Sequence, residues 1–502
     1  MSFEPVFETI NYKCGKKVLT EQIKSECRSD VSTDAVSSVL NVSAFTTISQ
    51  TQVVDGKVEY GGKIIFYISY VDADGRLCKC ECGSEYKGNI KNECIKTDSL
   101  VTVRAAVEKA YSDLSGARLV ANAFISLTAE ITSCEQVSAL AGGENLVVKE
   151  SELSYVKSCG IKKATYPIEE EFQLGYAVSE VLSHRAQAVI TAVQCGVGCI
   201  IVDGEVIISA IMLQNEQRND IIKENKTIPY RMEIECEDAM PNMQAIARVK
   251  ENSFKTDVSV DQEAGVSVVG VSVSLEFEGE AFYNDVITVA SDAFSTEQEI
   301  ELVEKDLLCT KAGELKNCYS VVSGRCATNE LPVGASVLAV GGERAEILNI
   351  VCDGQKTIVN GTLSATAYMR DNEKTFTVFL ETPFESSLDC CFECSANLEV
   401  VAKAKNARAR IVSLTETELE SDINFTIYPE ERNQIKVIGE IKSIGEKVKN
   451  DCAVSVYIPT NGEDLWSLAK RLNVCPVSLA QTNSDLKFPL TGEERIVIYR
   501  QK

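Results

Sequence analysis

The chain repeats itself, and this repetition constrains its fold more than any other feature of the sequence. Residues 35–40 read Ala-Val-Ser-Ser-Val-Leu, and residues 177–182, which lie 142 positions later, read Ala-Val-Ser-Glu-Val-Leu. Gly62 and Gly204 are separated by the same 142 positions, and each belongs to an apolar run. Matching segments at a constant offset indicate duplicated structural units. We therefore expect at least two copies of one fold in tandem.

A third, fainter copy follows the first two. Gly361, in the run Val-Asn-Gly-Thr-Leu, takes the place of the two earlier glycines. A matching alanine lies 44, 43 and 41 residues after the shared glycine in the three copies, at Ala106, Ala247 and Ala402. One domain usually holds about 150 residues, so the chain can hold three such units and a smaller one. We predict domains at residues 1–150, 151–310 and 311–450, with joints at 135–165 and 300–330, where Ala141-Gly-Gly-Glu144 and Lys311-Ala-Gly-Glu314 are typical turn residues.

Each unit has the pattern of β structure. Residues 265–276 (Gly-Val-Ser-Val-Val-Gly-Val-Ser-Val-Ser-Leu-Glu) alternate in polarity or are β-branched, which favours a half-buried strand. Asp74-Gly75 lies between two such runs and indicates a hairpin, because glycine accepts a positive φ. Many short strands with frequent turn residues favour antiparallel sandwiches over alternating strands and helices. We predict a mainly β protein of three tandem antiparallel sandwich-like domains.

The last 50 residues follow a different pattern, after a connector at 446–452. A helix is predicted over 464–472, because apolar residues recur there at the spacing i, i+3, i+4 and i+7. Pro476 favours the first turn of a second short helix, which reaches about Asn483. Residues 495–499 (Arg-Ile-Val-Ile-Tyr) are typical of a closing strand. We predict a small strand–helix–helix–strand module at 453–502.

This module resembles LysM, a small glycan-binding βααβ unit. The likeness is carried by Gly462, Leu465, Trp466, Ala469, the Asn473-Val474 turn, Leu479, Asn483 and Leu490. In the family, acetylated amino sugars lie between the loop after the first strand and the loop after the second helix. The resemblance implies that residues 462–466 and 483–490 form the corresponding loops here.

Carboxylates in these loops favour a protein ligand over a sugar. Glu463 and Asp464 follow Gly462 where the family has Gly-Asp-Thr, and Asp485 lies in the second loop. Carboxylates are costly to bury against a neutral sugar, whereas a basic or amide-rich protein surface suits them. Leu465, Leu486, Phe488 and Leu490 could form the apolar centre of such an interface, and Trp466 could either pack internally or stack on a sugar. The predicted glycan- or partner-binding residues are Gly462, Glu463, Asp464, Leu465, Trp466, Asn483, Asp485, Leu486, Phe488 and Leu490.

Tandem β repeats joined to a terminal LysM module resemble the SPOCS-domain spore-coat proteins of anaerobic endospore formers. The glycine-centred strands at Gly62, Gly204 and Gly361 carry this likeness over residues 30–445. The resemblance implies a non-enzymatic adaptor in the mother-cell cytoplasm, at the forespore surface. Its implied partner is the morphogenetic ATPase scaffold of the coat's basement layer. The alternative is a peptidoglycan-binding protein that acts at the cell wall or spore cortex, with an acetylated amino-sugar glycan as ligand.

Composition excludes several other classes of partner. The net charge of −24 argues against nucleic acid and against anionic lipid, since both need basic surface. The first residues lack the basic and apolar regions of a signal peptide. The most apolar stretch, 197–213, is interrupted by Asp203 and Glu205, so we expect no direct insertion into a membrane.

Cysteine and histidine give few catalytic candidates. Without an export signal, most of the 20 cysteines should be reduced. The clusters Cys78-Lys-Cys80-Glu-Cys82 and Cys390-Cys391-Phe-Glu-Cys394 leave three alternatives, namely unliganded thiols, late oxidative cross-links and a structural metal. The single histidine, His184, is expected at a surface or sheet edge. With neither a nucleophile–base pair nor a phosphate-binding loop, we expect no enzymatic activity and no cofactor.

Overall fold

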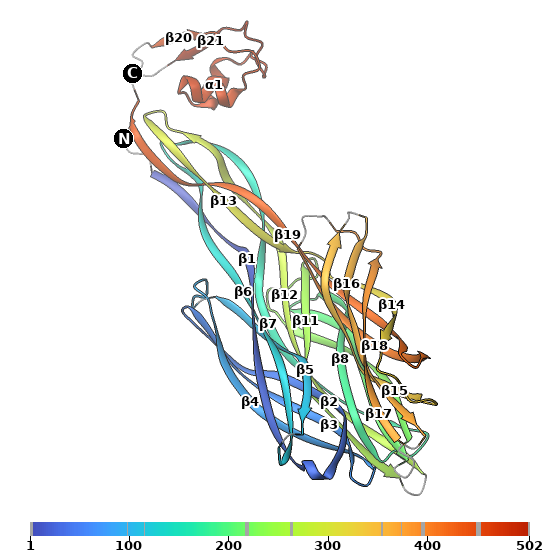
Figure 1. Ribbon diagram of the computed structural model, residues 1–502. Helices are drawn as coiled ribbons and strands as arrows, with labels where there is room; N and C mark the ends of the chain where they lie inside the picture. The colour runs from blue at the N-terminus through green and yellow to red at the C-terminus, as the bar shows by residue number, and fades with distance from the viewer. Residues whose placement is uncertain are drawn as a thin grey trace.

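A computed structural model describes residues 4–97, 99–114, 116–215, 220–261, 265–352, 355–372, 374–392, 397–447 and 453–499. The protein is mainly β, with 78% strand and 4% helix, which confirms that part of the predicted fold class. Within this described part, antiparallel strands form three pairs of facing sheets, a stalk and a small C-terminal module (Figure 1). The predicted connector at 446–452 falls largely on residues 448–452, which lie outside the described residues.

The first sheet pair is built from residues 4–144. Its two sheets have the strand orders β1-β6-β5 and β2-β3-β4. Alternating apolar residues, such as Ile64 and Phe66 on β3 and Ile125 and Leu127 on β6, bury one face of each sheet against the other. The strands are β1 (Glu4–Ser32), β2 (Val36–Val54), β3 (Lys57–Asp72), β4 (Leu77–Lys91), β5 (Leu100–Asp113) and β6 (Arg118–Glu144), with a 3-10 turn at Thr33–Ala35 between β1 and β2.

The second sheet pair has the same topology. Its sheets have the orders β11-β12-β7 and β10-β9-β8, and Val202, Ile208, Val271 and Phe277 lie in the core between them. The strands are β7 (Val147–Gln173), β8 (Glu180–Cys195), β9 (Cys199–Asn215), β10 (Asp220–Glu235), β11 (Gln244–Asp261) and β12 (Val266–Phe294).

The third sheet pair differs from the others in one respect. Its first strand is interrupted and gives two segments, β13 and β14, which pair with different parts of β19. The remaining strands repeat the earlier order, and Leu363, Leu380, Ile423 and Phe425 form part of the core. The strands are β13 (Gln298–Ala312), β14 (Lys316–Ala327), β15 (Ser336–Cys352), β16 (Thr357–Asp371), β17 (Lys374–Leu388), β18 (Asn397–Ser413) and β19 (Glu416–Glu446).

The repeated glycine of the sequence has the same neighbours in each sheet pair. An aromatic residue of the adjacent strand lies opposite it, with Gly62 opposite Tyr86, Gly204 opposite Tyr230 and Gly361 opposite Phe384. A Cβ atom on Gly204 would lie 2.2 Å from the carbonyl oxygen of Val189 and 2.3 Å from the hydroxyl of Tyr230. Only glycine leaves room for the aromatic ring and the neighbouring backbone at this point.

The outer ends of six long strands continue into a stalk that all three sheet pairs share (Figure 1). Its buried cluster combines Ile10 of β1, Val137 of β6, Tyr155 of β7, Val289 of β12, Leu307 of β13 and Val437 of β19. Most of the predicted joint at 135–165 therefore lies in paired strands, and most of the joint at 300–330 lies in β13 and β14. The glycines of residues 141–144 suggested a turn, but Gly143 pairs with Pro5 of β1. The chain instead reverses at residues 145–146 and 295–297.

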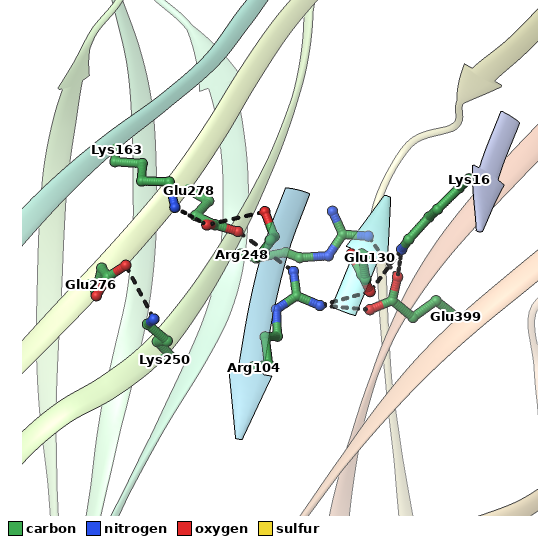
Figure 2. Close-up of polar contacts among 10 residues, drawn as sticks. Lys16, Arg104, Glu130, Lys163, Arg248, Lys250, Glu276, Glu278 and Glu399 are labelled. Carbon is green, nitrogen blue, oxygen red and sulfur yellow. Dashed lines mark hydrogen bonds and ion pairs between the residues drawn. The ribbon is translucent and has the colours of Figure 1, made fainter. Parts of the chain in front are cut away.

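The sheet pairs meet around a central cavity of about 1210 Å³. Charged side chains from all three pairs line its wall and contact one another (Figure 2). Glu399 of the third pair accepts from Arg248 of the second at 2.6 Å and from Lys16 of the first at 2.9 Å. Further ion pairs join Lys16 and Arg104 to Glu130, and Lys163 to Glu278. This charged cluster ties the three sheet pairs together.

The C-terminal module has the predicted order of strand, helix, helix and strand. Its elements are β20 (Val454–Tyr457), α1 (Leu465–Leu472), α2 (Pro476–Thr482) and β21 (Ile496–Tyr499). The carboxylate of Asp464 caps α1 by accepting from the Ser467 backbone N–H, and Asn473 ends the helix with a φ of 59°. Among the described residues, neither helix is long and apolar enough to cross a bilayer.

Candidate functional site

The C-terminal module rests on the tip of the stalk through its only tryptophan. Nε1 of Trp466 donates to Oδ2 of Asp292 at 2.8 Å, and the ring meets Phe294 edge to face with the centroids 5.4 Å apart. Nζ of Lys470 binds the other carboxylate oxygen of Asp292 at 2.6 Å. Asn473 donates to the carbonyl oxygen of Thr296 at 2.6 Å. Of the two alternatives for Trp466, packing within the protein is therefore the one observed. The indole already contacts Phe294 and Asp292.

Asp292 is the centre of this contact. Burial acts to raise the pKa of Asp292, but the hydrogen bonds from Lys470 and Trp466 outweigh it and lower the pKa below its ordinary value. The carboxylate therefore stays ionised and holds both partners from the module. The contact sets the position of the module relative to the three sheet pairs.

We expect Asp292→Ala to release the tryptophan. Loss of both hydrogen bonds should weaken the docking by about 1–3 kcal/mol and expose the indole to water. Because Trp466 is the only tryptophan, the change should appear as a red shift of the intrinsic fluorescence and easier quenching by iodide. Asp285→Ala, on the same strand but paired with Tyr155 and Lys157, is the matched control and should leave the emission unchanged. Equal emission from both variants would show that Asp292 does not hold the module.

The first predicted loop uses its carboxylates internally. Both oxygens of Glu463 bind Arg471, at 2.7 and 2.8 Å, and the carboxylate is only 9% exposed. Asp464 caps α1, as described above, and Gly462, with a φ of 85°, forms the turn between them and the strand. The expectation that Glu463 and Asp464 face a basic partner together therefore needs correction. Their partners come from the module itself, three to eight residues along the chain.

Most of the predicted residues in the second loop also contact other residues of the module. The side chain of Asn483 donates to the carbonyl oxygens of Leu479 and Val497 and accepts from the Val497 N–H at 2.7 Å, so it joins α2 to β21. Leu490 is 1% exposed and belongs to the module core, which corrects its assignment to an interface. Leu465, Leu486 and Phe488 are half-buried against the same core. Of the predicted residues in this loop, Asp485 is the one that remains exposed.

The exposed apolar surface of the module lies elsewhere, on the outer side of β20 and β21. Val454, Val456 and Ile458 alternate along the chain and are 55%, 61% and 69% exposed, and Tyr499, opposite Val454, is 66% exposed. The inner side of the sheet carries Ile496 and Ile498, which are buried against the helices. We call these four exposed residues the outer face. They were not among the predicted site residues, although aliphatic residues occupy every second position from Val454 to Ile458 in the sequence.

In the described part of the chain, β20 pairs only with β21, so no described strand lies along its other edge, whereas the backbone of Val497 on β21 is bound by the side chain of Asn483. Open edges carry backbone N–H and C=O groups ready to pair with another strand. An apolar face beside an open edge suits an added strand from another polypeptide. Within the described residues, the module therefore presents an exposed apolar sheet face beside an open strand edge.

The histidine lies inside the molecule, contrary to the expected surface or edge position. The imidazole of His184 meets the rings of Tyr67 and Phe254 edge to face, at 4.5 and 4.8 Å, and Nδ1 lies 2.5 Å from the hydroxyl of Thr256. It therefore lies between the first and second sheet pairs, on the wall of the central cavity. Burial, aided by Lys79, lowers the pKa of His184 to about 4.

We expect the imidazole to stay neutral in the folded protein at pH values where an exposed histidine is protonated. The unfolded chain binds this proton near pH 6.5 and the folded chain near 4, so stability should fall as the pH drops through that interval. A proton NMR titration of the single imidazole should give a midpoint near 4. A midpoint near the ordinary value would show that His184 is exposed.

No protein-family model, curated protein or solved structure matches this chain. What the molecule does must therefore be inferred from its own geometry. Two features are relevant, namely the outer face at one end of the molecule and the three sheet pairs at the other (Figure 1).

Proposed function

We propose that the protein is a non-enzymatic adaptor in endospore coat assembly, which binds partner proteins through a LysM-like module carried on three SPOCS-like domains. The observation that carries this proposal is the outer face of β20 and β21, where large apolar side chains lie exposed beside the open edge of β20. Exposed apolar patches of this kind mark interaction surfaces. The domains of this proposal are those predicted at residues 1–150, 151–310 and 311–450, and the presence of three sheet pairs, which begin at β1, β7 and β13, supports a threefold division.

The occupant that we propose for the outer face is an extended segment of the coat's basement-layer ATPase scaffold. A strand added to the open edge would gain backbone hydrogen bonds, and its apolar side chains would cover Val456 and Ile458. A sugar is less suited to this module, because Trp466 is held by Asp292 and Glu463 by Arg471. The module is placed at the stalk tip, so a bound scaffold would lie far from the sheet pairs (Figure 1). The adaptor would then act in the mother-cell cytoplasm, at the forespore surface.

The proposal predicts that one charge on the outer face abolishes localisation. In sporulating cells, Val456→Glu should spread from the forespore surface into the cytoplasm, because the carboxylate cannot be buried under an apolar partner strand. Val286→Glu changes a valine of similar exposure, 54% against 61%, on β12 in the stalk and should localise normally. Fluorescence microscopy of tagged full-length variants measures the difference. Normal localisation of Val456→Glu, at wild-type abundance, would contradict the docking surface.

A further inference from the structure

Each of the three sheet pairs holds two cysteines whose thiols lie close enough to interact. In every pair, one cysteine lies on the first strand and the other lies on the fourth strand or one or two residues beyond its end. Among the described cysteines, the neighbouring pairs of this kind are Cys27 of β1 with Cys82 of β4, Cys159 of β7 with Cys236 after β10, and Cys318 of β14 with Cys390 after β17.

Neighbouring contacts support each pairing independently. Sγ of Cys27 lies 3.1 Å from the carbonyl oxygen of Gly83, the residue after Cys82. Sγ of Cys159 lies 4.0 Å from the carbonyl oxygen of Asp238, two residues after Cys236. In the third pair, Cys390 belongs to the buried core of the third sheet pair and the partly buried Cys318 packs against that core. The first and fourth strands belong to different sheets, so every thiol pair spans the two sheets of one sandwich.

We propose that these are three sites of intrachain disulfide formation, each of which bonds the two sheets of one sheet pair together. The oxidant that we propose is a small-molecule disulfide such as oxidised glutathione. The two cysteine thiols lose two electrons and two protons and form one S–S bond, while the small disulfide breaks and takes them up as two thiols. Closing a long loop in this way stabilises a protein chiefly by restricting its unfolded chain.

Burial makes the reaction slow while the protein is folded. It raises the pKa of Cys82 to about 12 and the pKa of Cys318 to about 11, so few thiolates are present to attack an oxidant. The pairs therefore stay reduced in a reducing compartment. They form disulfides when an oxidant is present and the fold around the thiols opens locally. The exposed cysteines have other neighbours, since Cys94 contacts Lys17 and Cys391 contacts the carbonyl of Gln355.

The test is disulfide mapping of the full-length protein. The reduced protein is unfolded in denaturant, refolded in a glutathione redox buffer at mildly alkaline pH, alkylated and digested without reduction. Mass spectrometry should find linked peptides for 27–82, 159–236 and 318–390. The thermal midpoint of the oxidised protein should exceed that of the reduced protein by about 5 °C.

A matched pair of variants keeps the proposal falsifiable. Cys82→Ala should lose one linkage and part of the thermal shift. Cys80 lies on the same face of β4 but is hydrogen-bonded to Ser29, so Cys80→Ala should keep all three linkages. Any of three results would overturn the proposal. They are glutathione adducts at the six sites, scrambled linkages, and bound zinc that protects Cys159, Cys195, Cys199 and Cys236 from oxidation.

Discussion

Replacing Gly204 by alanine is expected to destabilise the protein by about 3 kcal/mol or more. The added Cβ would lie 2.2 Å from a backbone carbonyl oxygen of β8 and 2.3 Å from the buried hydroxyl of Tyr230. The carbonyl belongs to a paired strand, so it cannot move away without breaking the sheet. Urea unfolding, followed by far-ultraviolet circular dichroism, measures the loss as a shift of the midpoint.

Gly270→Ala is the control for the intrinsic effect of alanine in a strand. Gly270 also lies in the middle strand of a sheet, but its nearest neighbour would be 3.9 Å from a new Cβ. Alanine should be tolerated there. Gly62→Ala and Gly361→Ala should behave like Gly204→Ala, because a carbonyl oxygen lies 2.3 and 2.2 Å away at these sites. Equal midpoints for Gly204→Ala and Gly270→Ala would contradict the close approach at the repeated glycine.

Glu399→Gln is expected to cost about 2–4 kcal/mol, because it removes the carboxylate that joins the three sheet pairs. Arg248 and Lys16 would lose their charged acceptor at the cavity wall (Figure 2). Glu418→Gln, which breaks an exposed ion pair with Arg410, should cost less than about 1 kcal/mol. The two unfolding midpoints in urea measure the contrast. Similar midpoints would show that the charged cluster adds little to the assembly.

The effect of Glu399 should also depend on pH. Burial alone would raise the pKa of Glu399, but Arg248 and then Lys16 overcome it and lower the pKa to about 2 from 4.5. The carboxylate therefore stabilises the fold fully above pH 4.5, and this contribution is lost as the pH falls toward 2. The difference in stability between the wild type and Glu399→Gln should shrink over this interval. Most of this interval lies below the one in which His184 titrates, from 6.5 to about 4, so the two contributions can be separated.

Much of the local structure could be predicted from the sequence. The apolar alternation around Gly62, Gly204 and Gly361 marked strands, and their constant spacing marked repetition. The two short helices of the module could be predicted from Asp464, Pro476 and the apolar spacing between them. These signals are local, because capping, turn formation and alternation depend on residues a few positions apart.

Contacts between distant segments could not be predicted in this way. The glycines at 142 and 143 read as a turn, but β1 pairs with them across more than a hundred residues and keeps them in a strand. Trp466 is bound by Asp292, 174 residues earlier, and nothing near either residue signals the contact. The internal partners of Glu463 and Asn483 were missed in a similar way, since these side chains look exposed in sequence but bind Arg471 and Val497 within the module.

The most direct test of the proposed adaptor is a binding titration of the full-length protein against two ligands, the purified basement-layer ATPase scaffold and acetylglucosamine oligomers. We predict binding to the scaffold, a loss of about tenfold or more in affinity for Val456→Glu, wild-type affinity for Val286→Glu, and no measurable binding of the sugar. Binding of the sugar without the scaffold, or scaffold binding that Val456→Glu leaves unchanged, would contradict the proposed role of the outer face.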